Sequence, residues 1–164
     1  MSVTSEAPAM VMPAEALHQH WQGHRRLTRR VVEAFPEDQL FTFTLGGMRP
    51  FGVMVAELVS IGAPMLRGIV TDQWAPMSTR DDTKPVAKTD LLNQWDADTA
   101  TIDELWPKLT PALFQETKTA FGQYPGRVYE LLLYGIDNEI HHRAQGYVYL
   151  RALGIAPPPF YERD

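Results

Sequence analysis

Two polar residues, Asn138 and His142, lie within a long apolar helical pattern near the C-terminal end of the sequence. Because they are four residues apart, a helix places them on the same face. That face continues at core-facing spacing through Leu131, Gly135, Tyr149 and Leu153. Polar groups on a buried seam are costly unless they find partners, so we expect them to form hydrogen bonds in the core or to hold a ligand there.

A third polar residue, Glu57, is the only charged residue between positions 50 and 66 and lies among apolar residues of a second predicted helix. An unpaired core carboxylate is strongly disfavoured, and a metal ion, a protonated histidine or an arginine can offset its cost. Helical bundles build metal sites from inward carboxylates and histidines, although an amide oxygen is a weak ligand for transition metals. Two interpretations stay open: Glu57, Asn138 and His142 hold a divalent metal, or Glu57 and His142 form a buried hydrogen-bonded pair.

The neighbours of His142 are expected at ordinary helix positions. Glu139 and Arg143 are spaced for an ion pair within one helix, in the favourable order. His141 is one step round the helix from His142, which favours a surface or interface position over a place in the same mononuclear site.

The first predicted helix carries a group of histidines and basic residues. His20 and His24 share a face that can bind a metal, but two histidines at this spacing are a weak signal, and surface histidines are the preferred interpretation. Arg25-Arg26 and Arg29-Arg30 recur at helical spacing beside Glu33, which is typical of a solvated helix face.

Length and composition limit the classes of protein to which this chain can belong. The 164 residues predict one domain over residues 13–164, preceded by a flexible arm over residues 1–12. A net charge of −5 argues against a dedicated nucleic-acid surface. The absence of cysteine excludes disulfides, thiolate nucleophiles and thiolate-bound metals, and it fits a cytoplasmic protein. We identify no signal peptide, no uninterrupted membrane-spanning stretch and no phosphate-binding or catalytic motif.

Apolar periodicity predicts the elements that position these residues. Four amphipathic helices are expected, over residues 14–35, from about residue 50 to about 70, from a cap at Thr89 to about 105, and 127–153. Pro64 should kink the second helix or lie near its end. Residues 36–49 predict an extended connection, residues 71–88 and 114–126 predict loops, and Pro107 and Pro111 bracket a turn. With no convincing strand pairing, the expected fold is an all-α four-helix bundle with a long crossover.

Three segments resemble a known family. Residues 139–145, with Tyr147-Val148-Tyr149-Leu150-Arg151-Ala152-Leu153-Gly154, resemble the fourth-helix signature of the DinB-like (YfiT-like) superfamily. Met48-Arg49-Pro50-Phe51-Gly52 resembles the lead into its second helix, and Phe121-Gly122-Gln123 resembles its pre-helix segment. The resemblance covers about residues 14–159.

The resemblance implies an up-down-down-up four-helix bundle, commonly a homodimer. Family members typically hold a divalent metal with three histidines, one from the second helix and two from a His-x-x-x-His pair on the fourth. The resemblance therefore implies a possible divalent metal in this chain, Zn, Ni, Mn or Mg. They include thiol transferases that use bacillithiol or related thiols, mycothiol-dependent isomerases, and proteins linked by name to DNA-damage induction.

This sequence matches the family's ligand pattern at one of three positions. His142 matches the last histidine, Asn138 stands in place of the first histidine of the pair, and Glu57 stands near the second-helix position. The first hypothesis is a pocket between the second and fourth helices that binds a small molecule, with metal-dependent hydrolysis or thiol transfer and Glu57 as ligand or general base. The alternative is a metal-free, non-catalytic, stress-related binding or interaction protein in which the polar pair fixes bundle register.

Overall fold

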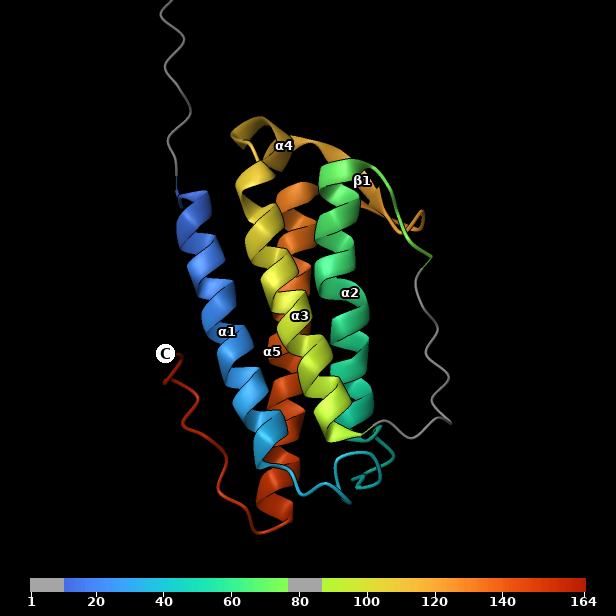
Figure 1. Cartoon of the computed structure of the whole chain (residues 1–164), viewed down its shortest axis with the longest axis vertical. Helices are drawn as coiled ribbons and strands as arrows, with labels where there is room; N and C mark the ends of the chain where they lie inside the picture. Colours follow the sequence, from blue (N-terminus) through green and yellow to red (C-terminus); the bar gives the residue numbers. More distant parts are fainter. Residues whose placement is uncertain (1–10, 77–86) are drawn as a thin grey trace, which may run out of the picture.

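The computed structural model describes residues 11–76 and 87–164, and this part of the chain is mostly helical. The elements in order are α1 (Ala14–Ala34), α2 (Phe51–Thr71), α3 (Lys88–Leu105), the 3-10 helix η1 (Trp106–Lys108), α4 (Pro111–Gln115), β1 (Thr117–Ala120), β2 (Tyr124–Arg127) and α5 (Val128–Ala152). The four long helices, α1, α2, α3 and α5, lie side by side along the long axis of the molecule (Figure 1). The four helices predicted from periodicity are therefore confirmed, with bounds that differ by only one or two residues.

The hydrophobic core is divided into two clusters by a layer of buried polar side chains. One cluster contains Trp21 of α1 and Ile136 of α5, and the other contains Val31 of α1 and Tyr149 of α5. Between these positions on the same two helices lie the buried polar residues His24, Arg25, Thr28, Glu139, His142 and Arg143. Burial of apolar area drives the packing on both sides of this layer, whereas inside it each polar group needs a partner.

Helix α2 is the most apolar helix and packs against both α3 and α5. It continues through Pro64 to Thr71, so this proline lies in the helix interior and not near its end. By length and composition α2 can cross a membrane, but 61% of its apolar window is buried inside the protein. A buried core helix passes the same test, and that is the position of α2 here.

The predicted extended connection over residues 36–49 is wrong. The segment is a series of turns, in which the amides of Leu40 and Phe43 donate to the carbonyls of Pro36 and Gln39. Partly buried aromatic and aliphatic side chains of the segment, including Phe41 and Phe43, pack on the second core cluster. The alternation of apolar residues thus reflects packing of a turn-rich segment on the core.

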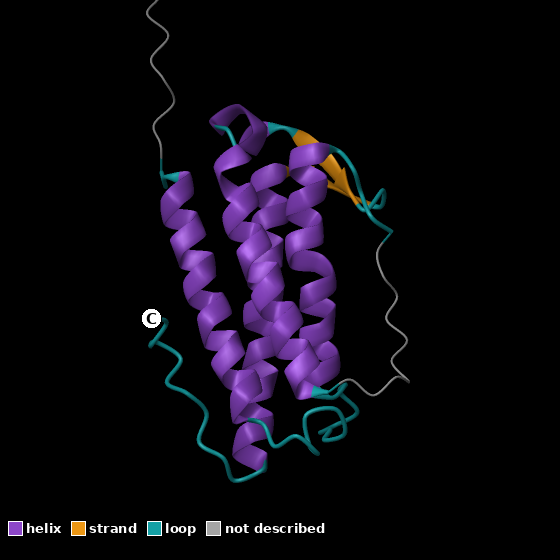
Figure 2. Ribbon diagram, in the orientation of Figure 1, coloured by secondary structure: helices purple, strands orange, loops and turns teal. Residues whose placement is uncertain are grey.

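The predicted loop over residues 114–126 is also wrong, because it contains a β-hairpin (Figure 2). Strands β1 and β2 are antiparallel, with Ala120 opposite Tyr124. Phe121 and Gly122 in the turn both have positive φ, a conformation that glycine adopts without strain. Two four-residue strands give little period-2 signal, and the described fold is helical with one hairpin, not strictly all-α.

Two smaller predictions about helix ends also need correction. Thr89 does not cap α3, because the N-cap is Ala87 and Thr89 lies inside the first turn. The turn expected between Pro107 and Pro111 contains η1 and the start of α4, where the Thr110 side chain accepts a hydrogen bond from the Leu113 amide. The predicted arm over residues 1–12 and the predicted loop over 71–88 fall largely outside the described residues.

Candidate functional site

Glu57 of α2 and His142 of α5 lie together where these two helices pack. The Glu57 Oε1 atom is 3.2 Å from the His142 Nε2 atom, a hydrogen-bond distance. The His142 side chain is 8% exposed and the Glu57 side chain is 30% exposed. The structure therefore brings together two of the three predicted site residues, in the hydrogen-bonded arrangement of the second interpretation.

Arg49 completes this cluster and was not identified from the sequence as a site residue. It lies just before α2, and its Nη1 atom is 2.6 Å from the Oε2 atom of Glu57. Burial raises the pKa of the Glu57 carboxyl, but hydrogen bonds from Arg49 and His142 outweigh this, so the pKa lies below its usual range. Glu57 is thus an ionised carboxylate whose two oxygens face two different donors. We call these three residues the Arg49–Glu57–His142 cluster.

The imidazole of His142 is neutral near pH 7. Burial lowers its pKa, and the hydrogen bond with Glu57 offsets only part of that effect. A neutral imidazole that faces a carboxylate through Nε2 carries its proton there and donates it to Glu57. The Nδ1 atom is then a buried acceptor, and it has no hydrogen-bond partner among the described residues.

Asn138 lies one helical turn before His142 on α5 and is partly buried. Its Nδ2 atom is buried and has no hydrogen-bond partner in the described part of the chain. The third predicted site residue is therefore on the same helix face as His142 but takes no part in the Arg49–Glu57–His142 cluster.

The residues of this cluster do not fit a three-histidine metal centre. They offer one carboxylate and one imidazole, whereas catalytic zinc sites use three protein ligands. The carboxylate charge that would attract a cation is already paired with the Arg49 guanidinium. Within residues 11–76 and 87–164, no group of three or more histidine, aspartate or glutamate side chains is arranged to hold a metal ion. Metal binding by Glu57, Asn138 and His142 stays a prediction.

The expectation that the α1 histidines and arginines are all solvated is wrong for His24 and Arg25, which are buried. Burial, then the charge of Arg143, lowers the pKa of His24 to about 3. Arg143 donates to the Nδ1 atom of His24 over 2.8 Å, so the proton of the neutral ring is on Nε2, which faces His20 Nε2 at 3.1 Å. A metal on that nitrogen would require an imidazolate, so the pair does not fit a metal site.

A buried ion-pair network between α1 and α5 was also missed. Glu139 and Arg143 form the predicted i,i+4 pair, with 3.7 Å between Oε1 and Nη1, but both are buried. The indole of Trp21 donates to Glu139 Oε2 over 3.2 Å. The sequence contains a signal for the burial of this pair, because Glu139 and Arg143 continue a core-facing spacing on α5. The positions with this spacing are Leu132, Ile136, Glu139, Arg143, Gly146 and Leu150.

A cavity lies between α2 and α3, and none of Glu57, Asn138 and His142 lines it. The pocket predicted between the second and fourth long helices, here α2 and α5, therefore stays a prediction, because this cavity lies between α2 and α3.

The chain is similar to a family of known fold. A family model described as DinB family matches residues 10–164. The fold matches a DinB-like protein, YjoA, from Bacillus subtilis, with 19% identity and a TM-score of 0.69, over 90% of this chain and 99% of that one. It also matches a DinB-like protein from Bacillus cereus, with 20% identity and a TM-score of 0.70, over 90% of this chain and 97% of that one. No curated protein matches the sequence.

Proposed function

The chain belongs to the DinB family, and on that premise we propose that it is a metal-independent binding protein, in which the Arg49–Glu57–His142 cluster replaces the family's three-histidine metal centre. The observation that carries this proposal is the distance of 2.6 Å between Arg49 Nη1 and Glu57 Oε2. The guanidinium supplies the positive charge that a metal ion would otherwise bring to the carboxylate.

The cluster acts as a link between helices in this proposal. Glu57 on α2 accepts from His142 on α5 and from Arg49 in the segment before α2. Because Arg49 and Glu57 are partly exposed, their pair contributes at most about 1 kcal/mol. Its main effect is then on the register of α2 against α5, a role that buried polar groups have in some helical proteins.

Metal binding tests this proposal directly. We expect the melting temperature of the wild-type protein to stay unchanged when Zn²⁺, Ni²⁺, Mn²⁺ or Mg²⁺ is added. The positive control is the double variant Glu57→His/Asn138→His, which restores histidine at both positions that depart from the family pattern. A metal at about 100 times its Kd adds about 2.7 kcal/mol to the free energy of unfolding. Stoichiometric metal in the wild-type protein purified without chelator, lost in His142→Ala, would overturn the proposal.

The competing hypothesis is a metal-dependent hydrolase or low-molecular-weight-thiol transferase. It uses the same proximity of Glu57 and His142, with His142 as ligand and Glu57 as ligand or general base. Metal content separates the two hypotheses before any substrate is known.

We also propose that the four long helices form an up-down-down-up bundle, and that two such chains associate as a homodimer. Figure 1 supports the order of directions, since α2 and α3 begin at one end of the molecule and α1 and α5 begin at the other. Exposed apolar side chains on α5, Leu133, Tyr134 and Val148, support an interface on that helix.

A further inference from the structure

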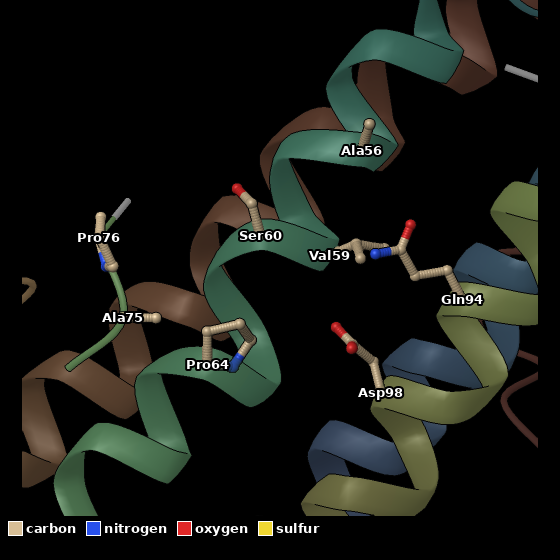
Figure 3. Close-up of a pocket in the computed structure, with 8 residues that line it drawn as sticks. All are labelled: Ala56, Val59, Ser60, Pro64, Ala75, Pro76, Gln94 and Asp98. Atoms are coloured by element: carbon tan, nitrogen blue, oxygen red, sulfur yellow. The ribbon is translucent and has the colours of Figure 1, made fainter. Parts of the chain in front are cut away.

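A cavity of about 370 Å³ lies between α2, α3 and the segment that follows α2 (Figure 3). Its volume falls within the range of about 300–1,000 Å³ that is usual for small-molecule sites. The cavity is lined by Ala56, Val59, Ser60 and Pro64 of α2, Ala75 and Pro76 after it, and Gln94 and Asp98 of α3. Most of these side chains are apolar, so the few polar groups decide what the cavity can bind.

Among the described residues, Asp98 is the one ionisable side chain in this lining. Figure 3 shows its carboxylate directed from α3 into the space beside Val59 and Pro64. Its Oδ2 atom is buried and has no hydrogen-bond partner among the described residues. A buried carboxylate oxygen without a donor is costly, and a ligand that donates a hydrogen bond would remove that cost.

Ser60 of α2 also lines the cavity, and Figure 3 shows its hydroxyl directed away from Asp98. Pro64 has no amide hydrogen, so the Ser60 carbonyl lacks the donor that a helix normally provides from four residues later. The Ser60 hydroxyl donates to the Glu57 carbonyl over 2.7 Å, which leaves its oxygen free to accept. The Asp98 carboxylate is thus the acceptor that faces the space between the two helices.

We propose that this cavity binds a small organic amine, with its ammonium group on the Asp98 carboxylate and its apolar body against Val59 and Pro64. An ammonium group has three donors and no acceptor, which complements a carboxylate. The apolar walls take up the hydrocarbon part of the ligand. This proposal rests on the proposed function as a binding protein, for which the cavity is the binding site and an organic amine is the ligand class.

Two arginines near Asp98 do not occupy the position proposed for the ammonium group. Arg25 of α1 and Arg67 of α2 attract the carboxylate electrostatically. Arg25 donates to the Trp95 carbonyl and to Thr99 Oγ1 and stacks on the Trp95 ring, so its hydrogen bonds are directed elsewhere. Neither arginine forms an ion pair with Asp98 within the part of the chain that the structure describes.

Three probes of similar shape and different charge test the proposal: 2-phenylethylamine, neutral 2-phenylethanol and anionic 3-phenylpropionate. Binding to the full chain is measured by calorimetry at neutral pH and mapped by amide chemical shifts. We expect the amine to bind most tightly and to shift amides around Ser60 and Asp98. Equal affinity for the alcohol, no amine binding at millimolar concentration, or shifts confined to other helices would overturn the proposal.

Two variants and a control locate the interaction. Asp98→Asn should weaken amine binding by about tenfold or more, since it removes one partner of a charged hydrogen bond. Ser60→Leu fills the cavity from α2 and should abolish binding of every probe while Asp98 is retained. Glu104→Gln removes an exposed charge from the same helix and should leave binding unchanged. Unchanged amine affinity in folded Asp98→Asn or in folded Ser60→Leu would contradict the assignment.

The amine and metal experiments test the two proposals separately. Metal uptake by the wild-type protein would overturn the proposed function through the Arg49–Glu57–His142 cluster and would leave the cavity assignment intact. Failure of the amine to bind would leave the metal-independent role of that cluster unchanged.

Discussion

The carboxylate of Glu139 on α5 accepts a hydrogen bond of 2.6 Å from the hydroxyl of Thr28 on α1, and both side chains are buried. Arg143 donates to the same hydroxyl and to the His24 carbonyl. Two buried arginines, Arg25 and Arg143, are thus attracted to one buried carboxylate, and Glu139 is the largest electrostatic attraction on each. The polar layer that divides the core depends on Glu139.

Removal of the Glu139 carboxylate should therefore destabilise the protein strongly. Glu139→Ala leaves the buried guanidinium of Arg143 without its ion-pair partner and removes the largest electrostatic attraction on Arg25. We expect a loss of about 3–5 kcal/mol in the free energy of unfolding. Asp137→Ala, an exposed acid on the same helix, should change it by less than about 0.5 kcal/mol. Urea unfolding measures both, and similar values for the two variants would contradict the role of Glu139.

The long helices could be predicted from the sequence because each carries a strong apolar period over many residues. Helix α1 begins after Pro13 and ends before Pro36, and α5 ends before Gly154, so local signals also mark the boundaries. The hairpin β1–β2 could not be predicted, because its strands have four residues each and β2 contains Pro125 and Gly126. Its stability comes from pairing and from contacts with α2 and α5, which sequence periodicity does not record.

The candidate site was predictable in part. Glu57 and His142 were identified because each is polar on an apolar face, and a single helix period is enough to show that. Arg49 was not, because it lies outside α2 and reaches Glu57 through a long flexible side chain. Arg25 was predicted to be solvated, and Glu139 was predicted only to form an ion pair with Arg143, since helical spacing alone does not distinguish a buried ion-pair seam from an exposed one.

Close packing of α5 on α2 depends on Gly146. A Cβ atom at this position would lie 2.6 Å from the Phe51 ring, which is itself buried. Gly146→Ala should lower the free energy of unfolding by about 1–3 kcal/mol through overpacking. Gly62→Ala is the matched control, because its Cβ would meet no atom closer than 3.5 Å, and it should stabilise α2 by up to about 1 kcal/mol. Thermal unfolding of both variants checks the sign of each change, and a stable Gly146→Ala would contradict the close approach.

The pKa of His142 should respond in opposite directions to its two neighbours. Glu57 raises this pKa through a hydrogen bond and its charge, so Glu57→Gln should lower it further. Arg49 lowers it through its positive charge, so Arg49→Ala should raise it. NMR titration of the imidazole carbon-bound protons follows both shifts. If neither variant moves the titration, the Arg49–Glu57–His142 cluster does not form in solution.

The exposed apolar side chains of α5 give a test of the proposed homodimer. Tyr134 is 56% exposed and Val148 is 53% exposed, and both lie on the outer face of α5. Tyr134→Glu/Val148→Glu would place two charges in the interface and should convert the dimer to a monomer in light scattering after gel filtration. Phe160→Glu, which changes an equally exposed aromatic residue beyond α5, should leave the dimer intact. A monomeric wild-type protein at every concentration would contradict the prediction.

Asp98 should make stability depend on pH in a defined direction. Burial raises its pKa from 3.8 to about 6 in the folded protein, although the charge of Arg25, a hydrogen bond from the Ala63 backbone and the charge of Arg67 oppose the shift. Between these two values the folded state holds the proton more tightly than the unfolded state, so the free energy of unfolding contributed by Asp98 falls as pH rises from about 4 to about 6. Above about pH 6 this loss is complete and persists, because Asp98 is then ionised in both states.

The variant Asp98→Asn removes this cost without removing the side chain. We expect its stability relative to wild type to rise from about pH 4 to about pH 6 and to stay constant above, since the neutral amide never becomes a buried charge. Glu104→Gln on the same helix serves as the control and should show a nearly constant difference across this range. Stability curves of Asp98→Asn and wild type that run parallel through this window would mean that Asp98 is solvated, and that its carboxylate is not available in the form that the amine site requires.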